Sequence, residues 1–146
     1  MKTFLIASVC GLVLSFILVS PSFAERPLSS AEQAIVDSFA KKFNEELSWT
    51  ILIANERLIS DLTVNSLMMW RCGETGNEQT CESAAASVQE TEDSVPLALQ
   101  MTKTAITLAD RVKNAEIRKA HIEGFKAQIS KIENASLVNV LKNSGN

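Results

Sequence analysis

The feature that most constrains the fold of this chain is a stretch of 43 residues, 29–71, that contains neither glycine nor proline. Apolar residues recur in it at every third or fourth position: Ile35, Phe39, Phe43, Leu47, Ile51, Ala54, Leu58 and Leu62. This spacing places them on one face of an α-helix, whereas a half-buried strand would alternate at every second residue. The stretch therefore predicts helix.

A single helix over these residues would be about 65 Å long at 1.5 Å per residue. A compact domain of this chain length is only roughly 35 Å across. We therefore expect either a break in the helix or an elongated helical hairpin. Asn44, Asn55 and the Ser60–Asp61 pair are candidate break points, because Asn, Ser and Asp favour helix caps, and the sequence does not choose among them.

The second half of the chain predicts further helices. Residues 72–80 contain Gly73 and the Gly76–Asn77 pair and predict a turn. Residues 81–92 are rich in alanine and predict a short helix. A second long periodic run begins near Pro96, a residue suited to a first helical turn. Gly124 interrupts this run, and residues 137–141 add a final apolar stretch. We predict an all-α fold, an antiparallel bundle of three to four helices or an elongated helical hairpin, with one disulfide-closed loop.

The first 24 residues have the pattern of a secretory signal peptide. Lys2 precedes an apolar run over residues 4–19, Pro21 follows the run, and Ser22-Phe23-Ala24 offers small residues where a signal peptidase reads. The run is short for a membrane span, which needs about 20 residues. We therefore expect cleavage after Ala24, and residues 25–146 to form a single helical domain, periplasmic or secreted, without a stable membrane anchor. Cys10 lies inside the run and is expected to leave with the signal.

Two cysteines remain after such cleavage, Cys72 and Cys81. An isolated pair in an oxidising compartment predicts a disulfide. A redox pair usually has the C-x-x-C spacing, and a zinc site needs further ligands that the sequence lacks.

The residues needed for catalysis or cofactor binding are scarce. His121 is the only histidine, its neighbours form no nucleophile signature, and we expect it on a helix surface. Adjacent Glu45 and Glu46 diverge by about 100° on a helix, so they do not converge on one substrate. We therefore expect no enzyme, no cofactor and no metal site. An alternative is a bundle that carries a small ligand or haem, with His121 and Met68, Met69 or Met101 as ligands, although no C-x-x-C-H motif is present.

Charge is unevenly distributed. Residues 74–93 contain six acids and no base, whereas residues 103–142 contain eight bases and four acids. The whole chain has a formal net charge of -3. Without a basic excess or interleaved aromatic and basic residues, nucleic acid is not expected as a partner.

These observations leave a protein-binding module as the favoured function, of the inhibitor or immunity type or an envelope accessory protein. Met and Trp are favoured at recognition surfaces, and a disulfide-closed loop is already ordered before binding. The candidate partner surface is Met68, Met69, Trp70, Glu74 and Glu78. The competing interpretation, which we favour for the two methionines and Trp70, is that they lie in the core. A homodimer is expected if the apolar girdle Trp49–Ala54 is not covered within one chain.

Overall fold

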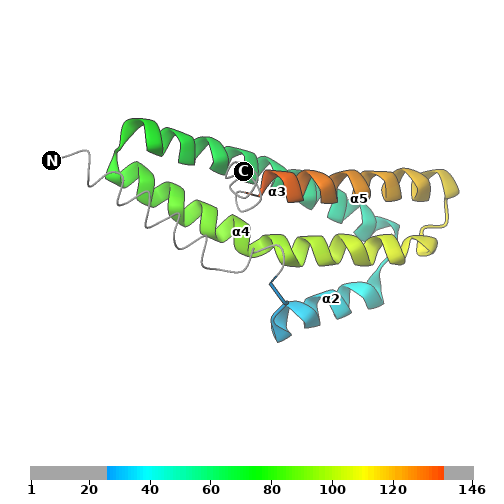
Figure 1. The fold of residues 1–146 in the computed structure, drawn as a ribbon. Coiled ribbons are helices and arrows are strands. Elements are labelled where there is room, and N and C mark those ends of the chain that lie inside the picture. The colour runs from blue at the N-terminus through cyan, green and yellow to red at the C-terminus, as the bar shows by residue number, and fades with distance from the viewer. Residues whose placement is uncertain (1–25, 137–146) are drawn as a thin grey trace.

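The computed structural model describes residues 26–136, and all regular structure in that range is helical. It contains α2 (Ser30–Lys42), α3 (Glu45–Thr75), α4 (Glu78–Thr107), the short 3-10 helix η2 (Ala109–Arg111) and α5 (Ala115–Ala135). Helices α3 and α4 form a long antiparallel hairpin, α5 packs along the first half of α3, and α2 lies beside α4 (Figure 1). The predicted all-α bundle is confirmed. The expected signal peptide and the apolar stretch at 137–141 lie outside the described residues.

The first long helix breaks at Asn44. The Asn44 side chain accepts a hydrogen bond from the backbone N–H of Leu47 and so caps the start of α3. The other two candidate break points are wrong, because Asn55 and the Ser60–Asp61 pair lie inside α3. Asn55 is buried, and its amide bonds to Thr102 on α4 instead of to its own backbone. A tertiary partner therefore replaces the cap that Asn would otherwise form.

The turn between the hairpin helices is shorter than expected. Helix α3 continues through Gly73 to Thr75. It ends at Gly76, which has a φ of 60° and donates its N–H to the Cys72 carbonyl. Asn77 then caps α4 by accepting from the Thr80 N–H.

The two helices expected over 81–92 and from Pro96 onward are one continuous helix, α4. A proline inside a helix forfeits a backbone hydrogen bond and costs about 3 kcal/mol. Pro96 is buried, and its neighbours Val95 and Leu99 are buried in the core. Their burial against α3 and α5 offsets that cost, which sequence propensity alone does not reveal.

The second periodic run is also interrupted, but not at Gly124. The break lies at η2, and Asn114 caps α5 by accepting from the N–H groups of Glu116 and Ile117. Helix α5 passes straight through Gly124, where a Cβ would lie 3.1 Å from Leu52 Cδ2. This glycine allows α5 to approach α3 closely.

The core consists of two apolar clusters. One joins α2, α3, α4 and α5 near the η2 end: Phe39, Phe43, Ile51, Ala105, Val112 and Phe125. The other lies farther along α3: Leu62, Val95, Leu99 and Ile132. Asn55 is the centre of a buried polar layer, with its amide donating to Thr102 Oγ1 at 2.9 Å and to Gln128 Oε1 at 3.0 Å.

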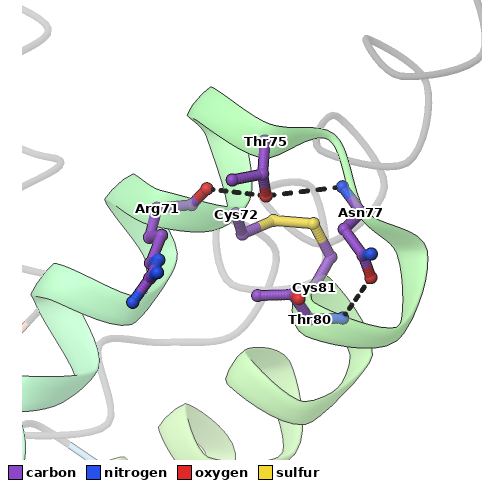
Figure 2. The surroundings of a disulfide bond; sticks show 6 residues. All are labelled: Arg71, Cys72, Thr75, Asn77, Thr80 and Cys81. Carbon is purple, nitrogen blue, oxygen red and sulfur yellow. Dashed lines mark hydrogen bonds between the residues drawn. A yellow bond between two sulfur atoms is a disulfide. The ribbon is translucent and has the colours of Figure 1, made fainter.

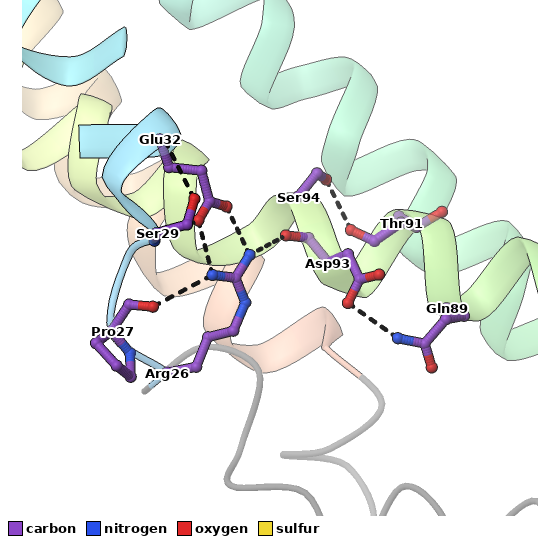
Figure 3. A network of polar contacts seen from close by, with 8 residues as sticks. All are labelled: Arg26, Pro27, Ser29, Glu32, Gln89, Thr91, Asp93 and Ser94. Carbon is purple, nitrogen blue, oxygen red and sulfur yellow. Dashed lines mark hydrogen bonds and ion pairs between the residues drawn. The ribbon is translucent and has the colours of Figure 1, made fainter. Parts of the chain in front are cut away.

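The N-terminal end of the described chain is held against α4 by Arg26 (Figure 3). Its guanidinium makes a bidentate ion pair with Glu32 at 2.6 and 2.8 Å and donates to the Asp93 carbonyl at 2.9 Å. Hydrogen bonds from Arg26 and from Ser29, the N-cap residue of α2, lower the pKa of Glu32 to about 2. The start of α2 is thereby fixed to the middle of the hairpin.

Candidate protein-binding surface

The predicted partner residues lie at the far end of the hairpin. Met68 and Met69 are half-buried, whereas Trp70 is 65% exposed, and Glu74 and Glu78 are exposed on either side of the turn. The expectation that Trp70 belongs to the core is therefore wrong. Helix α3 turns its buried side toward α4 and α5, and Trp70 lies on the side that faces away from both.

The predicted Cys72–Cys81 disulfide is confirmed and joins the two helices of this end (Figure 2). Its Cα atoms are 4.9 Å apart, and both cysteines are buried. Thr75 Oγ1 donates to the Arg71 carbonyl and accepts from the Asn77 N–H, which adds hydrogen bonds across the turn. The backbone beneath Trp70 is therefore covalently tied to α4.

Trp70 belongs to a longer apolar surface that sequence periodicity does not identify. Five side chains that are 48–68% exposed follow the outer side of α3: Trp49, Ile53, Val64, Leu67 and Trp70. At 100° per residue they fall within one third of the helix circumference, opposite the buried residues Ile51, Leu62 and Cys72. We call these five residues the outer stripe. It is about 32 Å long at 1.5 Å per residue.

The sequence does contain two segments that correspond to most of this apolar surface. The residues Trp49–Ala54 and Leu67–Trp70 are apolar almost all round the helix, a pattern that usually indicates burial on several sides. Among the described residues, α4 and α5 are the main neighbours of α3, and Trp49, Ile53, Leu67 and Trp70 in these two apolar turns remain exposed. The number of neighbouring helices, which periodicity does not encode, decides the difference.

His121 is buried, so the expected helix-surface position is wrong. It is 2% exposed, its Nδ1 lies 2.7 Å from Ser48 Oγ on α3, and the Trp49 ring packs against it edge-on at 4.4 Å between centroids. Its Nε2 has no hydrogen-bond partner among the described residues. Desolvation lowers the pKa of His121, and the carboxylate of Glu45 opposes this shift. Met101, the other proposed ligand of a cofactor, is half-buried against the phenylalanine cluster.

A groove runs between α3 and α4 beside the outer stripe. It has a volume of about 480 Å³ and is lined by Val64 of the stripe and by the carboxylates Asp61 and Glu90. Beneath it, Asn65 donates to Thr91 Oγ1 at 2.8 Å and accepts from Ser87 Oγ at 2.8 Å. The apolar stripe is therefore bordered on its α4 side by an acidic groove with a fixed polar floor.

Comparison with protein-family models, curated proteins and solved structures finds no match for this chain. Residues 26–136 include no helix whose length and apolar content suit a membrane crossing. They also bring together no group of three His, Cys, Asp or Glu side chains able to hold a metal ion. The described fold and surface define a disulfide-linked helical bundle with an exposed apolar helix face.

Proposed function

We propose that this protein is a helical binding module that holds another protein through the outer stripe of α3. The observation that carries the proposal is the exposure of two tryptophans and three aliphatic side chains along one helix face. Exposed apolar side chains gathered on one face mark interaction sites, and tryptophan is enriched among residues that dominate binding energy.

The rigidity of the helix supports the same proposal. Buried contacts with α4 and α5 and the Cys72–Cys81 disulfide order α3 before any partner arrives. Binding to a pre-ordered surface loses less conformational entropy than binding to a flexible one. The disulfide also supports a place of action outside the cytoplasm, where such bonds persist. We include in this proposal export by cleavage after Ala24.

The test is capture of partners from the native envelope or medium by the protein produced from its full-length sequence and processed by the cell. The double variant Leu67→Ser/Trp70→Ser removes two stripe side chains. Ile35→Ser is the matched control, because Ile35 is 48% exposed on α2 and lies away from the stripe. We expect the double variant to weaken binding of a stoichiometric partner at least about tenfold, the loss typical of one binding hot spot.

The control should bind as the unmodified protein does. A partner that the double variant retains at full affinity would show that the stripe is not the binding surface. Mass spectrometry of the exported protein checks the processing site, and an N-terminus other than Glu25 would contradict cleavage after Ala24.

A further inference from the structure

We propose that the occupant of the outer stripe is a second copy of this chain, whose α3 packs antiparallel to the first about a twofold axis near Ser60. This inference rests on the proposed function, since it names the partner of the same surface. It commits to self-association and not to a different protein.

Four of the five stripe residues are arranged symmetrically about Ser60, whereas the fifth, Val64, has Glu56 as its counterpart. Ile53 and Leu67 lie seven residues to either side of Ser60, and Trp49 and Trp70 lie eleven and ten residues away. A twofold interface requires that residue i touches residue j of the second copy while j touches i. Antiparallel pairing of this stripe satisfies the requirement with tryptophan opposite tryptophan and isoleucine opposite leucine. The small side chain of Ser60 at the centre allows the two helices to approach closely.

Charged residues along the α4 side of the stripe have the same symmetry. In antiparallel helices, residues on the same flank face each other across the interface. Arg57 then faces Asp61 of the second copy, and Glu46 faces Arg71. Both contacts occur twice and both join opposite charges. Parallel pairing would instead place the α4-side flanks of the two copies on opposite sides of the interface, so neither of these contacts would form.

These four charged residues have no ion-pair partner in the described monomer. The ion pairs found among residues 26–136 involve other side chains: Arg26–Glu32, Arg118–Asp110 and Lys131–Glu56. Asp61 also shares its groove with the carboxylate of Glu90. A guanidinium from a second copy would therefore meet two carboxylates there. Complementary charge mainly sets the register and the specificity of such a contact.

The expected affinity is modest. One helix face lies at the small end of stable interfaces, which start near 600 Å² per partner. The same pairing also brings Glu45 toward Glu74 of the second copy at the two ends. We therefore expect a dimer that dissociates in the micromolar range.

The experiment is sedimentation equilibrium of the cell-processed protein between about 1 and 200 µM, a range that brackets micromolar dissociation. Arg57→Glu and Asp61→Arg each replace two attractive contacts by two repulsive ones. Each single variant should therefore weaken dimerisation at least about tenfold.

An equimolar mixture of the two variants restores opposite charges at both contacts and should form a heterodimer with the original affinity. Ile35→Ser should dimerise unchanged, and Leu67→Ser/Trp70→Ser should stay monomeric.

A monomer at every concentration, or a mixture no tighter than the single variants, would overturn the second copy as occupant. If a different protein is then captured and lost on Leu67→Ser/Trp70→Ser, the proposed function stands and only this inference falls. If the double variant changes neither self-association nor capture, both fall. Circular dichroism of each variant verifies that the helices remain folded.

Discussion

At the scale of single residues, His121 gives the clearest consequence. It is the only histidine, it is buried, and desolvation lowers its pKa below the ordinary 6.5. Below about pH 6.5, His121 binds a proton in the unfolded chain but remains neutral in the folded chain. The folded state therefore loses stability as the pH falls, by at most about 1.4 kcal/mol per pH unit.

We predict that the free energy of unfolding, measured in urea, decreases between pH 7.5 and pH 5. His121→Asn keeps a polar atom near Ser48 but does not titrate, so it should flatten this part of the profile. A profile equally steep in His121→Asn would assign the effect to carboxylates instead.

At single residues, the sequence predicted covalent chemistry better than it predicted burial or exposure. The disulfide was predictable from the number of cysteines and the expected oxidising compartment. The burial of His121 and the exposure of Trp70 were not, because both depend on which helices lie nearby. A histidine between Arg118 and Lys119 on one side and Ile122 on the other has no local signal that separates core from surface.

At the scale of helices, the two helical glycines differ in their environment. Gly73 lies inside α3 with open space where a Cβ would lie, and its φ is not positive. We predict that Gly73→Ala stabilises the protein by about 0.5–1 kcal/mol, because alanine restricts the unfolded chain and favours helix. Gly124→Ala should gain less, since its Cβ must displace Leu52 Cδ2 from 3.1 Å. Thermal unfolding of both variants tests the order, and a larger gain at Gly124 would contradict it.

The disulfide should contribute most of its effect through the unfolded chain. Closing a loop of this separation, nine residues, corresponds to about 2.6 kcal/mol by loop entropy. We predict that Cys72→Ser/Cys81→Ser lowers the free energy of unfolding by roughly that amount. Urea titration provides the measurement, with Ser83→Ala on the exposed side of the same turn of α4 as the control. A loss well below about 1 kcal/mol would show that the reduced tip retains its order in the unfolded state.

Helix was predicted where a long periodic run decides it, as over most of α3, whereas the break at Asn44 was only one of three candidates that the sequence did not rank. Helix was not predicted where packing overrides a breaker, as at Pro96 and Gly124. Most residues of the outer stripe belong to the two segments Trp49–Ala54 and Leu67–Trp70, which are apolar on almost every side of the helix. Its exposure emerged only once the helices covering α3 were known.

At the scale of the whole molecule, α3 has polar contacts at three levels, two of them buried and the third partly buried. Ser48 meets His121 on α5, Asn55 meets Thr102 and Gln128, and Asn65 meets Ser87 and Thr91 on α4. We predict that Asn55→Leu costs about 1–3 kcal/mol, because the Gln128 carbonyl loses its Asn55 partner in a buried site. Urea unfolding measures this, and Gln89→Leu, which breaks an exposed hydrogen bond to Asp93, should cost little.

The same three levels prevent α3 from moving along its axis. Helices that meet only through apolar side chains can slide past one another by a turn, about 5.4 Å. Here one turn of sliding would separate all three polar contacts, at about 1–3 kcal/mol for each of the two buried levels. This cost is a large part of the whole stability of a domain, about 5–15 kcal/mol. Helix α3 is therefore held in one position along its axis, and the proposed partner would meet a stationary surface.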